Sequence, residues 1–170
     1  MNTQFKAARV ENYRVSDRSA ADIRYLVIHF TANDGDTAKN NADYFARAEI
    51  STSAHYFVDE NEVWQSIRDA DIAWHCGTRG VYFHPYCRNA NSIGIELCSR
   101  KNGEKFYFMP ETVRRAQTLV RGLMAKYGIP IEKLCATTML RTKTVLRRSS
   151  RAHPRGQHSS RVYRKRRNLT

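Results

Sequence analysis

The chain has 170 residues and a formal net charge of +13, a length that suits one domain with a sizeable core. Hydrophobic residues make up 41% of it, which excludes a wholly disordered chain. No apolar run approaches the roughly 18 residues that cross a membrane, and the first residues lack the apolar stretch of a secretory signal. The excess of positive charge first suggests a nucleic-acid binder.

The positive charge is concentrated at one end of the chain. Residues 136–170 carry 11 Lys and Arg and no acidic residue, whereas residues 1–135 carry 18 Lys and Arg against 16 Asp and Glu. The tail also lacks apolar periodicity, so we expect it to be disordered. A basic tail suits nucleic acid, an anionic wall polymer or an acidic membrane equally well, and its composition does not choose among them.

The first clear elements are a strand and a helix. Residues 25–28 (YLVI) form a continuous apolar run, which is typical of a strand buried on both faces in an α/β sheet. The run ends in His29, and a turn-rich stretch follows it. Thr37 can then cap a helix that continues to about Arg47.

A hairpin and a long loop come next. Two β-rich runs, 54–58 and 63–67, flank an acidic turn at 59–62, a pattern that predicts a β-hairpin. Residues 76–91 are expected to form a loop. The four cysteines are widely spaced and include no C-x-x-C pair, so we interpret most of them as buried thiols rather than a disulfide framework.

The last elements are a strand, a helix and a further strand. In residues 92–97 (SIGIEL), Ile93, Ile95 and Leu97 alternate with Gly94 and Glu96, which predicts a strand with two different faces. A helix is expected from Pro110, with a stripe of apolar residues up to residue 127. Gly128 and Pro130 end it, and residues 131–134 can lead into a final strand.

Four residues could carry chemistry, although none is specific by itself. His29 lies where a buried strand ends, which is where sites form in α/β sheets. Glu96 is on the strand face opposite the apolar set, and a solvated or salt-bridged glutamate is its ordinary interpretation. His75 could line a pocket, bind a metal or pack. His55 lies between apolar neighbours, so we expect a hydrogen-bonded structural histidine.

Taken together and in order, four segments resemble one family. Residues 25–31 (YLVIHFT), 53–59 (SAHYFVD), 73–77 (AWHCG) and 91–98 (NSIGIELC) are similar to the zinc-dependent N-acetylmuramoyl-L-alanine amidases of phage and prophage endolysins. The resemblance covers residues 20–135. It implies an α/β fold with a mixed central β-sheet flanked by helices, as in peptidoglycan recognition proteins.

The resemblance also implies an activity and a set of site residues. The family cleaves the amide between N-acetylmuramic acid and L-alanine in peptidoglycan. His29 would be the first Zn²⁺ ligand and Glu96 the catalytic carboxylate, while His75 and Tyr82 would line the substrate groove. Zinc lowers the pKa of its bound water, and a carboxylate moves the proton to the leaving amine.

The sequence departs from the family after Cys135. Relatives carry two further zinc ligands in a stretch like R-H-Y-D-V-T-x-K-x-C-P-x-P-F, whereas residues 136–149 read ATTMLRTKTVLRRS. If TGC encodes Cys135, the next codons read one base earlier can encode R-H-Y-D-V-T-D-K-N-C-P-A-P-F. We therefore hypothesise a frame shift after Cys135. His153 and His158 are poor substitutes, because a disordered tail supplies no preorganised geometry.

These observations predict an amidase-like domain at 1–135, C-terminally incomplete, and an out-of-frame basic tail at 136–170. Three functions stay open, in this order: an amidase impaired by the loss of two zinc ligands, a non-catalytic peptidoglycan-binding module, and a nucleic-acid binder acting through the tail. We expect a monomer whose partner is bacterial peptidoglycan. Without a signal peptide, it would stay in the cytoplasm until released to the cell wall.

Overall fold

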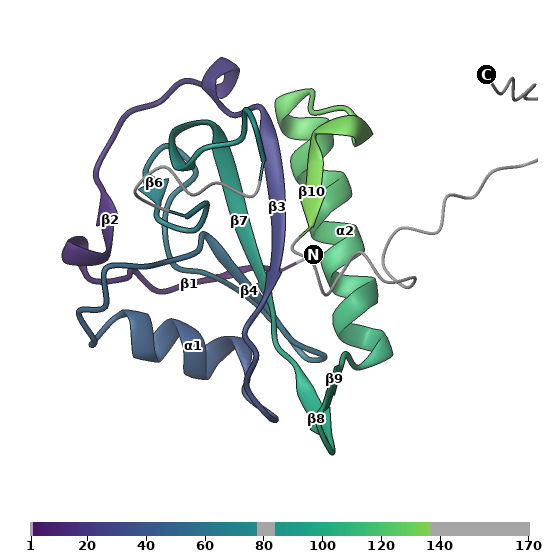
Figure 1. Ribbon diagram of the computed structural model, residues 1–170. Coiled ribbons are helices and arrows are strands. Elements are labelled where there is room, and N and C mark those ends of the chain that lie inside the picture. Colours follow the sequence, from purple (N-terminus) through teal and green to yellow (C-terminus); the bar gives the residue numbers. More distant parts are fainter. Residues whose placement is uncertain (1, 78–83, 137–170) are drawn as a thin grey trace, which may run out of the picture.

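A six-stranded mixed sheet forms the centre of the protein (Figure 1). The computed structural model describes residues 2–77 and 84–136. The central strands β4, β7, β3 and β10 are parallel, β5 is antiparallel to β4, and β1 is parallel to β5. The mixed α/β sheet predicted from the resemblance is therefore confirmed. The strands in sheet order are β1 (Gln4–Phe5), β5 (Val63–Gln65), β4 (Tyr56–Val58), β7 (Ser92–Leu97), β3 (Tyr25–Phe30) and β10 (Leu134–Ala136).

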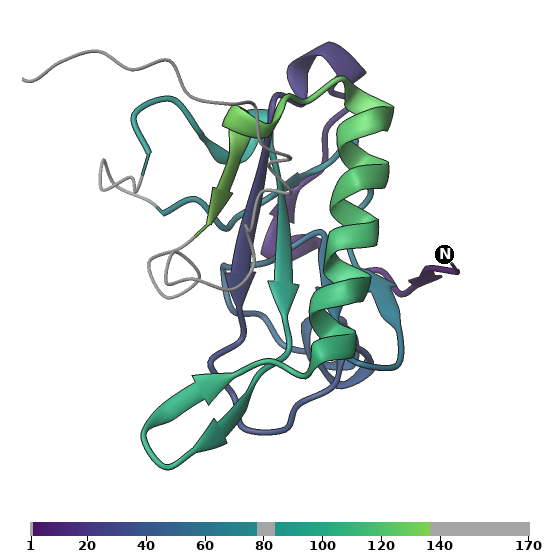
Figure 2. The ribbon, with the colours of Figure 1, turned by 90° about the vertical axis from the view of Figure 1, so that its right-hand side faces the viewer.

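Helix α2 (Pro110–Tyr127) covers one face of this sheet (Figure 2). It begins with Pro110 in its first turn and ends at Gly128, whose φ of +62° is a left-handed conformation that glycine adopts without a steric penalty. Its buried residues pack on the apolar side chains of β3 and β7. The predicted helix and its stripe are thus confirmed, with Leu119 added to the buried set.

Helix α1 (Ala38–Phe45) packs near β4 and β5, which form the predicted hairpin. The Oγ1 atom of Thr37 accepts a hydrogen bond from the Asn40 N–H at 3.1 Å, which confirms the predicted cap. The carboxylate of Asp59 joins the two elements, because it accepts hydrogen bonds from Ala38 in the helix and from Asn61 and Glu62 in the hairpin turn.

Several short elements had no sequence signal. Strand β2 (Tyr13–Arg14) pairs with β6 (Ile72–Ala73), and β8 (Arg100–Asn102) pairs with β9 (Lys105–Tyr107) in a second hairpin. Elements of two or three residues are too short to show a hydrophobic period. Four 3₁₀ turns complete the described elements: Val10–Asn12, Ala20–Asp22, Asn89–Asn91 and Ile131–Lys133.

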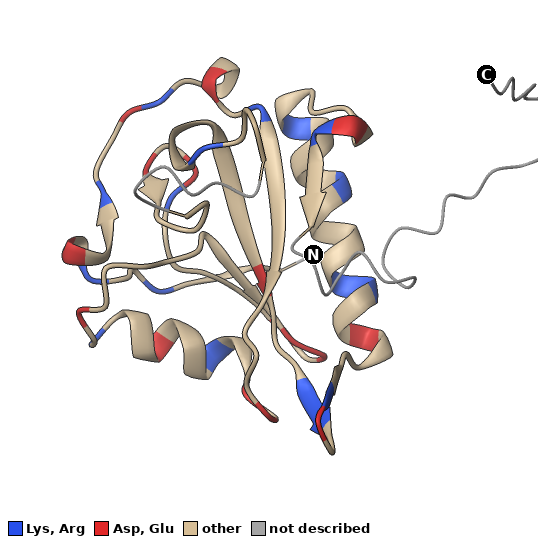
Figure 3. Ribbon diagram, viewed as in Figure 1, with Lys and Arg blue, Asp and Glu red and all other residues tan. Residues whose placement is uncertain are grey.

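The basic tail lies almost wholly outside the described residues, which end at Ala136. Its predicted disorder and the predicted boundary at residue 135 therefore stay predictions. In the described part, acidic and basic residues are both spread over the fold (Figure 3), in agreement with the nearly neutral balance of residues 1–135. No helix in that part is long and apolar enough to cross a membrane.

Candidate active site

His29 and Glu96 lie side by side at the carboxyl ends of two neighbouring parallel strands. Strands β3 and β7 are neighbours in the sheet (Figure 1). Their register pairs His29 directly with Glu96, so the two Cα atoms are separated by about 5 Å, the spacing of neighbouring strands. Their chain neighbours Ile28 and Ile95 belong to the core under α2. Because side chains alternate along a strand, both His29 and Glu96 project from the other face of the sheet.

His75 joins this pair from the segment that follows β6. Its Nδ1 atom lies 3.1 Å from Nε2 of His29, and the two rings meet edge to face. Its Nε2 atom lies 3.2 Å from the Ser92 hydroxyl. The backbone N–H groups of His75 and Cys76 both donate to Oδ1 of Asn89, at 2.9 and 2.7 Å. The structure thus brings together three of the four predicted site residues. The fourth, Tyr82, lies outside the described residues.

Gly94 makes the position of His75 possible. Gly94 lies on β7 between Ser92 and Glu96, and a Cβ atom there would be 2.6 Å from Cγ of His75. Real Cβ atoms do not approach a ring so closely, so the imidazole occupies the space that a side chain would need. The glycine of the GIE segment is therefore a packing requirement of the site.

His55 is hydrogen-bonded to the backbone of Gly94 in the same region. It is fully buried, and its Nδ1 atom accepts a hydrogen bond from the Gly94 N–H at 3.0 Å. Its Nε2 atom lies 3.2 Å from the Asp71 carbonyl oxygen and 3.0 Å from Nη2 of Arg18. The prediction of a hydrogen-bonded structural histidine is confirmed.

Burial sets the protonation states of the site. It lowers the pKa of His29 and of His75 to about 4, because an imidazolium is disfavoured away from water. Burial also raises the pKa of Glu96 to about 8, with a smaller contribution from the charge of Asp36. Oε2 of Glu96 meets no hydrogen-bond partner in the described part of the chain. At neutral pH the two imidazoles are neutral, and Glu96 can hold a proton and release it.

The described residues do not complete a metal site. Across residues 2–77 and 84–136, no group of three or more His, Cys, Asp and Glu side chains is arranged to hold a metal ion. Catalytic zinc normally has three protein ligands, and His29 has its Nε2 atom beside His75. The zinc that the resemblance implies therefore does not fit the residues of this part of the chain.

The sequence analysis did not predict that cysteines lie beside His75. All four are buried free thiols, as predicted. Cys76 and Cys87 lie within the same buried cluster as Cys135, next to His75. Ser92 and Asn89 were missed as partners of His75, because their contacts arise only when residues 75–76 meet residues 89–92 across the intervening loop.

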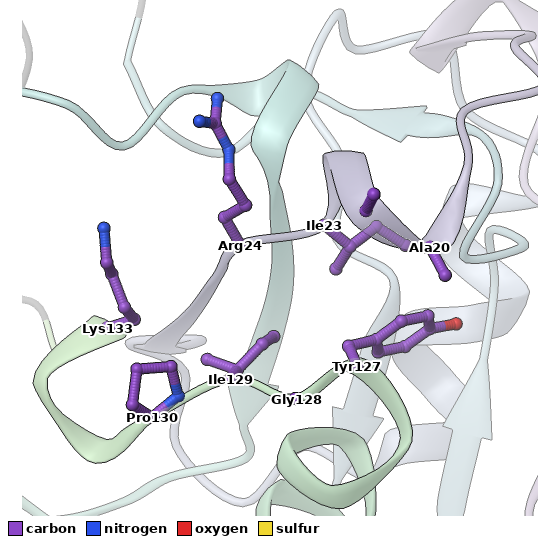
Figure 4. A pocket seen from close by; sticks show the side chains of 9 residues that line it. Ala20, Ile23, Arg24, Tyr127, Gly128, Ile129, Pro130 and Lys133 are labelled. Atoms are coloured by element: carbon purple, nitrogen blue, oxygen red, sulfur yellow. The ribbon is translucent and has the colours of Figure 1, made fainter.

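A hollow elsewhere is not part of this site. It lies at the end of α2, between residues 20–24 and 127–133 (Figure 4). Arg24 directly precedes β3, so the hollow is at the amino end of that strand, whereas His29 is near its carboxyl end. Lys133 beside it donates a hydrogen bond to the Tyr25 hydroxyl at 3.0 Å. This hollow holds none of the predicted site residues.

Comparisons with known proteins agree with the geometry. Residues 19–165 match the sequence model of a family described as N-acetylmuramoyl-L-alanine amidase. The chain is 31% identical over 134 residues to the N-acetylmuramoyl-L-alanine amidase CwlL of Bacillus licheniformis, a match that covers 74% of this chain and 36% of CwlL.

Solved structures are similar as well. The catalytic domain of XlyA has 29% sequence identity and a TM-score of 0.62, with 80% of this chain and 84% of that chain covered. PlyL has 27% identity and a TM-score of 0.63, with 80% of each chain covered. The chain therefore spans about a third of the length of a curated relative such as CwlL, but most of a solved catalytic domain.

Proposed function

The chain belongs to the N-acetylmuramoyl-L-alanine amidase family, and from that membership we propose that it acts on peptidoglycan, at the amide between N-acetylmuramic acid and L-alanine. The relatives that it matches carry this activity in their names. The reaction is a hydrolysis, in which water adds to the carbonyl carbon and the amine of L-alanine leaves.

The observation that carries the proposal is the pairing of His29 with Glu96 across β3 and β7. Glu96 has the role of the proton carrier: its carboxylate accepts a proton from the attacking water and then donates it to the leaving amine. Its pKa of about 8 suits both steps near neutral pH. His75, in contact with His29, lines the substrate groove, and we assign the same role to Tyr82.

For the metal, we propose that His29 is a zinc ligand whose partners were lost in the frame shift after Cys135. The register of β10 supports this idea. Leu134, Cys135 and Ala136 pair with Leu26, Val27 and Ile28 in parallel, so one further step of the same register points to the position beside His29. In the restored frame the second residue after Cys135 is a histidine, and it would fall at that step.

A restored chain tests the activity and the frame shift together. It carries R-H-Y-D-V-T-D-K-N-C-P-A-P-F after Cys135 and is compared with the natural chain. We expect tight one-to-one zinc binding by calorimetry and release of stem peptide from purified cell wall in the restored chain only. Glu96→Gln in the restored chain should keep zinc binding and lose most of the hydrolysis. Equal zinc affinity in both chains would contradict the frame-shift proposal.

A peptidoglycan-binding module without catalysis is the second candidate, because the groove residues are present while the described residues complete no zinc site. Sedimentation with cell-wall sacculi separates the two: binding without release of stem peptide supports the module. Nucleic-acid binding through residues 136–170 is the third candidate. It predicts an affinity for nucleic acid that falls steeply with salt concentration and that is lost when those residues are deleted. We further propose a monomer that reaches the wall from the cytoplasm.

A further inference from the structure

Two buried thiols lie close together beside His75. The Sγ atoms of Cys76 and Cys87 are 3.8 Å apart, and both side chains are almost completely buried. Cys76 directly follows His75 in the chain. The proposed hydrolysis assigns roles to His29, Glu96, His75 and Tyr82, so neither thiol has a part in it.

The backbone on both sides of the pair is already held in place. The N–H of Cys76 donates to Oδ1 of Asn89 at 2.7 Å, and the N–H of Cys87 donates to Nδ1 of His84 at 3.0 Å. The two sulfurs are at van der Waals distance, so closing the bond brings them from 3.8 Å to the bonding distance of about 2.0 Å.

We propose that Cys76 and Cys87 are a redox-active dithiol that closes to an intramolecular disulfide when it meets a small-molecule disulfide. The thiolate of Cys76 attacks one sulfur of the oxidant, and a thiolate leaves. The thiolate of Cys87 then attacks Sγ of Cys76 in the mixed disulfide and expels the second thiolate. The protein loses two protons and two electrons, and the oxidant is reduced to two thiols.

The surroundings of Cys76 connect this step to the candidate active site. Its Sγ atom lies 3.5 Å from Nδ1 of His75 and 3.2 Å from the Ser92 hydroxyl, and the same hydroxyl lies 3.2 Å from Nε2 of His75. The disulfide removes the thiol from this hydrogen-bonded group and fixes the chain on either side of residues 77–86. The dithiol is therefore stable in a reducing cytoplasm and closes in an oxidising exterior.

The remaining two cysteines provide the control variants, and one of them is a competing disulfide partner. Cys98 lies near α1, with its Sγ atom 3.6 Å from Nδ2 of Asn41, and belongs to a different buried cluster. Cys135 belongs to the same cluster as the pair and is the competing partner for Cys87. The Cys98→Ser and Cys135→Ser variants are therefore matched controls, since each removes a buried thiol without removing the pair.

The test uses the full chain, first reduced and then equilibrated in glutathione buffers of increasing oxidised fraction. We expect the unsubstituted chain and both control variants to lose two free thiols, with peptide mapping by mass spectrometry joining Cys76 to Cys87. The melting temperature should rise by about 5–10 °C on oxidation, because the bond restricts the unfolded chain by closing a loop of about a dozen residues. Cys87→Ser should show no rise.

Two results would overturn the proposal. One is a chain that keeps all four thiols in fully oxidised glutathione while it stays folded by circular dichroism. The other is a linkage that maps to Cys87 and Cys135. Both are read on the unsubstituted chain, so they do not depend on whether a variant folds. Because the readout is the thiol count and linkage, it is also independent of amidase activity.

Discussion

The two faces of the neighbouring strands β3 and β7 differ in their chemistry. Toward α2, both strands present only apolar side chains, which form the main core. On the other face, His29, Gly94 and Ser92 lie against the partly buried ring of His75, and Glu96 is paired with His29. The same backbone therefore supplies stability on one side and a costly polar site on the other. Substitutions on the two faces should therefore change the stability of the fold for different physical reasons.

The largest loss of stability is expected on the apolar face. Ile95→Ala removes a fully buried side chain and leaves a cavity, which should lower the free energy of unfolding by about 2–5 kcal/mol. Urea unfolding followed by circular dichroism measures it. Ile131 is half exposed, so Ile131→Ala is the matched control, with a change within about 0.5 kcal/mol. Equal losses at the two positions would contradict the assignment of the core.

A smaller loss is expected where the site is most crowded. Gly94→Ala places a Cβ atom against the ring of His75, which should cost about 1–3 kcal/mol through displacement of the imidazole. In a His75→Ala background the same change should cost much less, because the obstructing ring is gone. A double-mutant cycle in urea measures this coupling. Independent effects of the two substitutions would show that the ring does not occupy this space.

The carboxyl group on the polar face should also make the free energy of unfolding fall as the pH rises. The folded pKa of Glu96, about 8, lies above its value of about 4.5 in an unfolded chain. The stabilising effect of the protonated carboxyl is therefore complete below pH 4.5 and is lost as the pH rises through 8. Glu96→Gln removes this loss, so the variant should be more stable than the natural chain by about 1–3 kcal/mol above pH 8.

The measurement is urea unfolding of chelator-treated protein at several pH values from 4 to 9. His29 and His75 act in the opposite direction: their pKa values are lowered to about 4, so the stability they contribute is lost as the pH falls below about 6.5. They are present in both proteins, so their contribution cancels in the difference. A difference that does not grow between pH 4.5 and 8 would show that Glu96 is not a buried, uncompensated carboxyl.

The smallest effect is expected in α2, whose buried side includes the polar Thr112. Thr112 is fully buried, and its hydroxyl has no hydrogen-bond partner in the part of the chain that the structure describes. Thr112→Val keeps the shape and removes the unsatisfied hydroxyl, so it should stabilise the fold by up to about 1 kcal/mol. Thr118→Val, at an exposed helical position, is the comparison. A loss of stability at residue 112 would reveal a partner for its hydroxyl.

The sequence predicted the elements that have a period and the residues that end them. Strand β7 and helix α2 were predicted because Ile93, Ile95 and Leu97 alternate and because Pro110 and Gly128 mark the helix ends. How these elements pack in the fold could not be derived from the hydrophobic period of the sequence. The pairing of His29 with Glu96 depends on the register of two strands more than sixty residues apart, and only the family resemblance anticipated it.

The contacts of His75 could be predicted neither from the sequence periods nor from the family resemblance. Asn89 comes from the segment 76–91, which carries no regular pattern, and the alternation of residues 92–97 does not show that Ser92 meets His75. Nothing in the sequence joins Cys76 to Cys87 either, because their contact depends on how the two segments approach each other in the fold.

The place of β10 in the sheet has a consequence for the order of folding. Strand β3 pairs with β7 on one side and with β10 on the other, and β10 is translated roughly a hundred residues after β3. Pairings between such distant segments form slowly, since a long loop must close first. While the chain emerges from the ribosome, β3 therefore has one unpaired edge until residue 136 is free. Chaperone binding to nascent chains should fall once β10 has been synthesised and can cover that edge.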